Sequence, residues 1–245
     1  MWEKLPDATV QILASSSEEP VGSGFHLRSQ YLVVTNAHVV IPFINRGDTL
    51  LARTESGERQ ELSLINHSST DEYDFAVLEV DSKWSDERMA LKPSTQRPNR
   101  GADVLFSGHP LGYSDLLVQR GVVSGPAEDG FSIDAAVNSG NSGGPVVHRD
   151  TGDVLGIITV KGGVPPEEME SIYEAWSKVY FEAKRDNIRI QVGGYDQMEM
   201  NKLIAKTFDA LSGFITEYTS TGIGKAVSIE YADSAVVSHK AVLTG

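Results

Sequence analysis

The chain has 245 residues, of which 40% are hydrophobic, and this is enough apolar material for one sizeable domain or two small ones that share a cleft. Its 21 lysines and arginines against 34 aspartates and glutamates give a formal net charge of -13, which argues against nucleic acid and anionic membranes as partners and favours neutral or basic polypeptides. The absence of cysteine excludes disulfides, thiolate catalysis and cysteine-ligated zinc.

The N-terminal segment lacks the pattern of a secretory signal peptide. Residues 1–20 contain glutamates where such a peptide carries positive charge, and the apolar run at 10–14 is short and interrupted. No run in the chain approaches the roughly 18 apolar residues of a membrane span. The sequence therefore predicts a cytoplasmic protein.

Short strand-like runs dominate the first part of the chain. Turn-forming residues separate them, for example at 19–20 and 56–58, and this pattern is typical of an antiparallel sheet or barrel. The predicted strands are residues 9–13, 24–27, 31–35, 49–54, 61–65 and 75–80. Residues 81–100 contain two prolines and mixed charge, and they predict a connector.

A second strand-rich part follows the connector. Its predicted strands are residues 103–107, 117–123, 131–134, 146–148 and 154–160. The sequence thus predicts two β-domains, residues 1–90 and residues 91–245, joined by a polar linker.

The pattern changes after the glycines at 162–163. Apolar residues recur at spacings of three and four over 169–183 and again over 203–215, as they do on one face of a helix. Between these two faces, residues 188–192 alternate like a strand and end at a pair of glycines. The last part, residues 222–229, returns to strand-like character.

The most unusual local sequence surrounds Ser142. Residues 138–145 (Asn-Ser-Gly-Asn-Ser-Gly-Gly-Pro) place this serine among glycines between two strand-like runs. Glycines allow backbone conformations in which neighbouring N–H groups converge beside the hydroxyl, where an oxyanion could bind. A serine hydroxyl becomes a good nucleophile only when a base takes its proton. His38, at the end of a predicted strand, is the candidate base, and Asp74, the last acid before a buried strand, is the candidate carboxylate.

Six blocks of the sequence resemble, in order, the signature blocks of trypsin-like serine peptidases of the HtrA (Deg) type. They are residues 22–25 (Gly-Ser-Gly-Phe), 35–40 (Thr-Asn-Ala-His-Val-Val), 74–78 (Asp-Phe-Ala-Val-Leu), 108–112 (Gly-His-Pro-Leu-Gly), 121–125 (Gly-Val-Val-Ser-Gly) and 134–145, which ends in the serine block. The resemblance covers roughly residues 8–162. It implies two antiparallel six-stranded β-barrels with the active site between them, and the order His, Asp, Ser belongs to that fold.

The resemblance also implies a role for each site residue. Ser142 is expected to be the nucleophile, His38 the general base and then acid, and Asp74 the group that orients His38. The backbone N–H groups of Gly140 and Ser142 are expected to form the oxyanion hole. This chemistry needs no cofactor, and the remaining histidines lack the spacing of metal ligands, so no metal site is expected.

Substrate preference is inferred from two places. Ala136 stands six residues before Ser142, where trypsin has the acidic residue that selects lysine or arginine, so such a preference is not expected. The strand around Ile157, Ile158, Thr159 and Val160 is expected to pair with the substrate backbone and to favour small or medium apolar side chains.

The chain departs from the family pattern in its last third. HtrA-type chains usually continue into a peptide-binding PDZ domain, whereas residues 222–227 here resemble the closing strand of the protease fold. Residues 163–221 are then a helical insertion in a loop beside the specificity pocket. We expect it to act as a lid, an exosite or a docking surface for a regulatory protein partner.

Two functional classes remain open at this point. The first is an active serine endopeptidase that cleaves protein or peptide substrates, and a complete His, Asp, Ser set favours it. The second is a catalytically latent module that keeps the protease fold and uses the helical insertion as its interaction surface.

Overall fold

The computed structural model describes residues 1–16, 18–81, 83–84, 88–110, 113–159, 191–192, 195–196, 206–207 and 222–244. Its Cα positions divide into two compact units, Met1–Val160 together with Ser220–Gly245, and Lys161–Thr219. The first unit contains all the residues that the sequence analysis assigned to catalysis.

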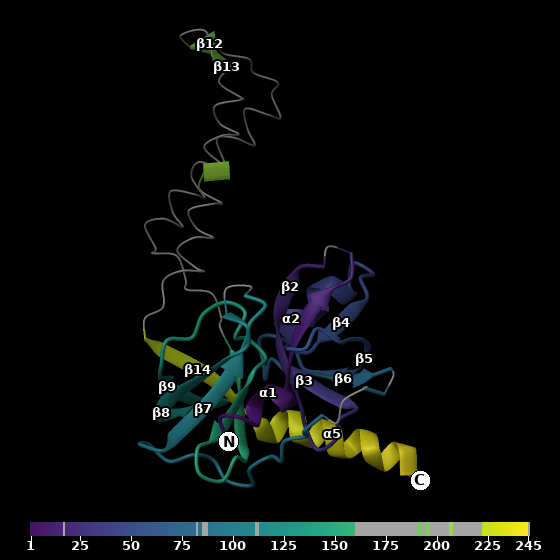
Figure 1. Ribbon diagram of the computed structural model, residues 1–245. Coiled ribbons are helices and arrows are strands. Elements are labelled where there is room, and N and C mark those ends of the chain that lie inside the picture. Colours follow the sequence, from purple (N-terminus) through teal and green to yellow (C-terminus); the bar gives the residue numbers. More distant parts are fainter. Residues whose placement is uncertain are drawn as a thin grey trace. The chain divides into compact units, whose positions relative to one another are not determined.

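Barrel 1 is closed by six antiparallel strands from the first third of the chain (Figure 1). In spatial order they are β1 (Thr9–Ala14), β2 (Pro20–His26), β3 (Leu32–Thr35), β6 (Ala76–Val80), β5 (Arg59–His67) and β4 (Leu50–Arg53). Helix α1 (Leu5–Ala8) precedes β1, and helix α2 (Ala37–Ile44) connects β3 to β4. All six predicted strands are present.

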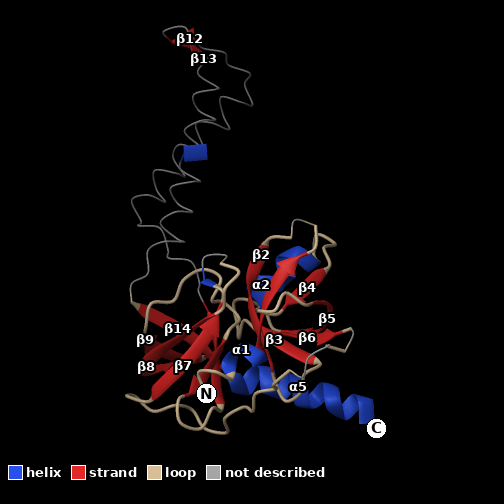
Figure 2. Cartoon of the chain, in the orientation of Figure 1, coloured by secondary structure: helices blue, strands red, loops and turns tan. Residues whose placement is uncertain are grey.

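Barrel 2 is closed by six further antiparallel strands (Figure 2). In spatial order they are β10 (Pro145–His148), β11 (Val154–Thr159), β14 (Ile223–Ser228), β9 (Gly130–Asp134), β8 (Leu117–Ala127) and β7 (Asp103–Gly108). Strand β14 lies between β9 and β11, so the strand predicted at 222–227 does close this barrel. The structure therefore confirms two six-stranded antiparallel barrels.

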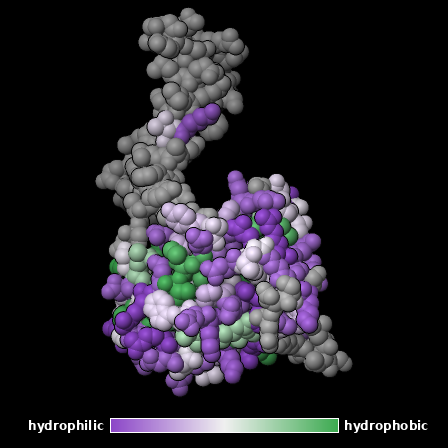
Figure 3. Space-filling view, viewed as in Figure 1, coloured by the Kyte–Doolittle hydropathy of each residue, from purple (hydrophilic) through white to green (hydrophobic). Residues whose placement is uncertain are grey.

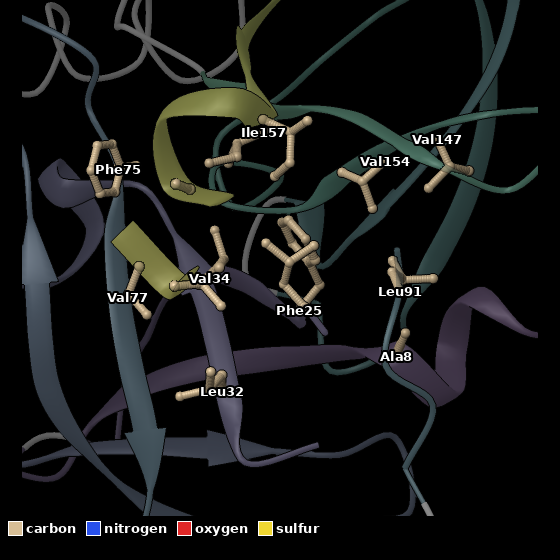
Figure 4. Packing of buried hydrophobic residues seen from close by; sticks show 14 of the residues in the cluster. Ala8, Phe25, Leu32, Val34, Phe75, Val77, Leu91, Val147, Val154 and Ile157 are labelled. Carbon is tan, nitrogen blue, oxygen red and sulfur yellow. The ribbon is translucent and has the colours of Figure 1, made fainter. Parts of the chain in front are cut away.

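The described residues form three hydrophobic clusters. One fills barrel 1 and one fills barrel 2. The third, the interface cluster, contains buried residues from both barrels, among them Phe25 of β2, Val77 of β6 and Val154 of β11, and Figure 4 shows these side chains gathered around Phe25. Burying an aliphatic or aromatic side chain contributes about 1.5–3 kcal/mol, so this cluster fixes one barrel against the other. A site at their seam can then be built from both.

Helix α5 (Ile229–Thr244) was not predicted: residues 222–229 were interpreted as strand-like, and no element was assigned to residues 230–245. The strand ends at Ser228, and the helix begins at the next residue. Ile229, Ala232, Ala235 and Val236 recur at spacings of three and one, and they pack into the interface cluster against both barrels. Ion pairs of Arg28 with Asp233 and of Arg97 with Glu230 fasten the start of the helix.

The predicted helical insertion at 163–221 lies largely outside the described residues. Within it, β12 (Gln191–Val192) and β13 (Tyr195–Asp196) pair antiparallel, and residues 206–207 are helical. Strand β12 ends where the sequence placed a pair of glycines. The two predicted helical faces, apart from residues 206–207, fall outside the part of the chain that is described.

The described surface is mainly polar. Figure 3 shows hydrophilic residues over most of it on this face, with the largest group of hydrophobic residues over barrel 2. Exposed apolar side chains of this barrel include Leu117, Val122 and Ile223. Among the described helices, none combines the length and the apolar character needed to cross a membrane.

Candidate active site

Two hydrogen bonds join His38 to Asp74 in barrel 1. The backbone N–H of His38 donates to Oδ1 of Asp74 at 3.0 Å, and Nδ1 of the imidazole lies 2.7 Å from Oδ2. One carboxylate therefore fixes both the position and the ring orientation of His38. A ring that donates from Nδ1 has its lone pair on Nε2, which is the arrangement a general base requires.

The sequence analysis placed His38 at the end of a strand, and this was wrong in detail. His38 lies in the first turn of α2, which begins directly after β3 and Asn36. Asparagine is a preferred residue just before a helix, but the apolar residues that follow resemble a continuing strand. The Asn36 side chain does not cap the helix, and it donates to the backbone O of Asp74 at 2.8 Å instead.

Asp74 is held in a conformation that few residues adopt. Its φ of +43° lies in the left-handed region, which costs of order 1–3 kcal/mol outside glycine and persists where the surroundings impose it. Its backbone N–H donates to the carbonyl of Ser69 at 3.1 Å, and the hydroxyl of Thr159 donates to Oδ2 at 3.1 Å. The residue is 1% exposed. Asp74 is thus fixed from both barrels.

The role of Thr159 in holding Asp74 was not foreseen. The sequence analysis assigned Thr159 to substrate binding, whereas its side chain is buried against the carboxylate of Asp74. The available signal was a hydroxyl residue at the end of an apolar strand, which by itself does not identify a partner 85 positions away.

Ser142 lies in the loop between β9 and β10, in a backbone shaped by glycines. Gly140 and Gly143 have φ values of +89° and +87°, and a Cβ atom added to Gly143 would lie 2.0 Å from the carbonyl oxygen of Ser23. The N–H of Gly143 donates to the carbonyl of Ile158 at 2.9 Å, and the carbonyl of Ser142 accepts from the N–H of Ser23 at 2.8 Å. Only glycine fits at position 143.

The same contacts bring the serine loop to the part of barrel 1 that carries His38. A Cβ atom added to Gly22 would lie 2.7 Å from Cγ1 of Val39 and 3.1 Å from the carbonyl oxygen of Ser142. Val39, the residue after His38, and the carbonyl of Ser142 therefore both lie within contact distance of Gly22. The loop of Ser142 thus lies beside the part of barrel 1 that carries His38.

The predicted substrate-binding residues divide into three groups. Ala136 is exposed in the stretch that leads from β9 to Ser142, where it is accessible to a ligand. Ile157 and Ile158 are fully buried, in the interface cluster and inside barrel 2 respectively. Val160 lies outside the described residues.

The prediction that Ile157 and Ile158 pair with substrate does not agree with the strand register. Ile157 is opposite Pro145 on one side and Val227 on the other, so its backbone edges are occupied within the barrel. Ile158 donates to the carbonyl of Gly144 and accepts from Gly143.

Two buried histidines lie outside the His38 and Asp74 pair. Burial, with the nearby charge of Arg88, lowers the pKa of His26 to about 3, and burial lowers the pKa of His109 to about 4. Both imidazoles are therefore neutral at pH 7. Among the described residues, no group of three or more histidine and acidic side chains is arranged as metal ligands.

Comparisons with known proteins place this chain among peptidases. A family model described as a trypsin-like peptidase domain matches residues 22–157. A probable periplasmic serine endoprotease of DegP-like type from Rhizobium meliloti is 32% identical over 145 residues, which is 56% of this chain and 27% of that protein. Serine protease HTRA3 from Rattus norvegicus is 32% identical over 162 residues, which is 57% of this chain and 32% of that protein.

A solved structure has the same fold. The crystal structure of the serine endoprotease from Yersinia pestis matches with a TM-score of 0.54 and 25% sequence identity, over 65% of this chain and 56% of that one. The chain spans about a third or less of the length of the two curated relatives. The similarity concerns their protease domains.

Proposed function

This chain belongs to the trypsin-like peptidase domain family, of HtrA/DegP type, and on that premise we propose that it is a serine endopeptidase that hydrolyses peptide bonds of protein substrates. The observation that carries the proposal is the pair of hydrogen bonds by which the buried carboxylate of Asp74 orients His38. This pair lies in barrel 1 beside the glycine-rich loop that contains Ser142. A structural histidine needs no such orientation.

In the proposed reaction, the hydroxyl of Ser142 attacks the carbonyl carbon of the scissile peptide while Nε2 of His38 takes its proton. Asp74 stabilises the imidazolium that forms, and the N–H groups of Gly140 and Ser142 receive the negative oxygen of the tetrahedral intermediate. His38 then protonates the leaving amine, which leaves an ester on Ser142. A water molecule repeats the sequence, releases the acid and restores the hydroxyl.

A fluorophosphonate probe tests the proposal without knowledge of the substrate. We expect the folded chain to be labelled at Ser142 and to degrade an unfolded protein such as casein, and we expect Ser142→Ala to abolish both. Loss of the nucleophile should lower turnover by about 10⁶-fold. Folded protein that is never labelled, with or without casein present, would support the latent alternative instead.

We also propose that residues 163–221 regulate cleavage, as a lid, an exosite or the docking surface of a protein partner. The segment leaves the barrel after Thr159, which bonds Asp74, and returns at Ile223. Gly224 lies so close to Val137 that an added Cβ would be 2.3 Å from its side chain, one residue from Ala136. Both attachment points therefore adjoin the proposed site.

The register of β11 and β14 permits a clean deletion. Thr159 stands opposite Lys225 in an antiparallel pair, so a two-residue Asn-Gly turn in place of residues 163–221 can join the two strands as a hairpin. We expect the shortened protein to fold and to differ in cleavage rate, specificity or captured partners. If all three properties match those of the full chain, regulation by this segment is refuted.

A further inference from the structure

Ser23 of β2 makes four hydrogen bonds although it is fully buried. Its N–H donates to the carbonyl of Ser142 at 2.8 Å, and its carbonyl accepts from the hydroxyl of Thr35 at 2.7 Å. Its own hydroxyl donates to the carbonyl of Gly140 at 2.7 Å and accepts from the N–H of His109 at 2.9 Å. A single side chain of barrel 1 thus bonds two separate loops of barrel 2.

The bond to Gly140 acts on one particular peptide group. The carbonyl of Gly140 and the N–H of Asn141 belong to the same peptide, which lies between the two N–H groups proposed to bind the oxyanion. Its oxygen is held by Ser23, and its N–H donates to the carbonyl of Asn138 at 3.0 Å. Rotation of this peptide would break both bonds at once.

Gly140 makes the peptide between Gly140 and Asn141 free to rotate unless a hydrogen bond from outside the loop fixes it. Gly140 has a φ of +89°, and a glycine can change its backbone angles more freely than any other residue. The next peptide is held from within the loop, because the carbonyl of Asn141 accepts from the N–H of Gly144 at 3.0 Å. Since C=O and N–H point in opposite directions in a trans peptide, that bond directs the N–H of Ser142.

We propose that Ser23 is a positioning residue for the oxyanion hole: its hydroxyl holds the peptide between Gly140 and Asn141, and so keeps the N–H groups of Gly140 and Ser142 aimed at one point. The inference rests on the proposed function. The close packing around Ser23 agrees with this role, because a Cβ atom added to Gly108 would lie 3.0 Å from the Ser23 hydroxyl.

Ser23→Ala is the direct test, and Ser107→Ala is its matched control. Both changes delete one hydroxyl from a fully buried serine, but the hydroxyl of Ser107 bonds the hydroxyl of Thr9 and not a residue of the serine loop. Losing one oxyanion donor costs about 10²–10³-fold, so misaiming it should lower the maximal rate of fluorophosphonate labelling by about 10–100-fold. The probe concentration for half-maximal rate should stay within about threefold, because binding of the probe precedes use of the oxyanion hole.

Hydrogen exchange supplies a readout that does not depend on activity. In Ser23→Ala, the peptide that covers residues 138–146 should exchange its amide protons faster than in the wild type, whereas Ser107→Ala should leave that peptide unchanged. If the wild type is never labelled by the probe, the proposed function fails, and the exchange result still decides whether Ser23 holds the loop. Equal labelling rates and equal exchange in the two variants would overturn the proposal.

A second substitution covers the case in which Ser23→Ala does not fold. Ser23→Cys keeps a side chain of similar shape but replaces the hydroxyl by a thiol, which is a weak donor and a weak acceptor. We expect a labelling rate between those of the wild type and the alanine variant, with exchange of residues 138–146 raised to match. A cysteine variant with wild-type rate and wild-type exchange would contradict the role of the hydroxyl.

Discussion

The two barrels contribute to the site in different ways. Barrel 1 supplies side chains, His38 and Asp74, whose placement depends on hydrogen bonds from Asn36, Thr159 and the backbone. Barrel 2 supplies the Ser142 hydroxyl on a backbone whose shape depends on the absence of side chains at Gly143 and Gly144. Apart from the hydroxyl of Ser142, the proposed chemistry should thus be sensitive to functional groups in barrel 1 and to added carbon atoms in barrel 2.

Asp74→Asn gives the largest expected effect on the barrel 1 side. The amide keeps the shape of the carboxylate, but its NH₂ group facing Nδ1 of His38 would favour the tautomer in which Nε2 carries the proton. We expect kcat to fall by about 10⁴-fold with the fold retained. The measurement is casein turnover together with the probe-labelling rate. A loss in kcat of less than about tenfold would show that turnover does not depend on the carboxylate of Asp74.

Gly143→Ala is the counterpart in barrel 2. The new Cβ would lie 2.0 Å from the carbonyl oxygen of Ser23 and 2.1 Å from the hydroxyl of Thr35, and backbone atoms cannot move far enough to accommodate it. We expect the free energy of unfolding in urea to fall by more than about 4 kcal/mol, or the protein not to fold.

Gly57→Ala separates the steric clash of an added Cβ from the cost of a positive φ. Gly57 also has a positive φ, +91°, but nothing lies within 4 Å of an added Cβ. It should cost only about 1–2 kcal/mol, the penalty of the left-handed conformation alone. Equal losses in the two glycine variants would show that steric fit around Ser142 is unimportant.

Each barrel also buries a neutral histidine, and this predicts a pH dependence of stability. His26 of β2 has its pKa lowered to about 3 and His109 after β7 to about 4, so the unfolded chain, with pKa values near 6.5, binds more protons between these limits. Above about pH 6.5 these two histidines should not alter the free energy of unfolding. It should fall by about 1.4 kcal/mol per pH unit for each histidine as the pH drops below that value.

Urea unfolding at several pH values checks this, with His26→Leu and His109→Leu as the two variants. Each should remove one histidine's share of the slope below about pH 6.5. Below about pH 4 only the His26 share persists, because His109 then takes up its proton in the folded state as well. A slope unaltered in both variants would contradict the assignment of the pH dependence to these two residues.

The smallest expected effect concerns the stack of Tyr73 on Tyr231, which joins the residue before Asp74 to α5. The rings lie 3.8 Å apart at 14°, and Tyr73 is 39% exposed. Tyr231→Ala should lose the stack, which contributes about 0.5–1.5 kcal/mol beyond the buried area of the ring, whereas Tyr231→Phe should retain it. Thermal unfolding distinguishes the two, and identical melting temperatures would remove the stack from the set of contacts that hold barrel 1.

The strands could be predicted, and candidate site residues could be chosen, because both leave local patterns. Most strands of the barrels contain a short apolar or alternating run, and Ser142, His38 and Asp74 stand in short blocks typical of a family. Helices α2 and α5 were missed because Val39 and Val40 resemble a strand, and because α5 starts with no turn after β14. At such a junction the hydrophobic pattern changes from the period of a strand to that of a helix within one or two residues.

What the sequence could not provide was the set of contacts between distant residues. Thr159 and Asp74 are separated by 85 positions, and Ser23 and Gly140 by 117. The strand predicted at 24–27 left out Ser23, whereas Ser23 is inside β2 and its hydroxyl bonds Gly140 of barrel 2. Such pairs depend on how the barrels pack, and packing is non-local.

The position of β14 also has a consequence for folding during synthesis. Barrel 1 is complete in sequence by Val80, so it can close while the ribosome still translates the rest. Barrel 2 cannot close before Ile223–Ser228 is made, and until then β9 and β11 each have an unpaired edge. A nascent chain that stalls within residues 161–221 therefore carries one finished barrel and one open sheet, the kind of intermediate that chaperones retain.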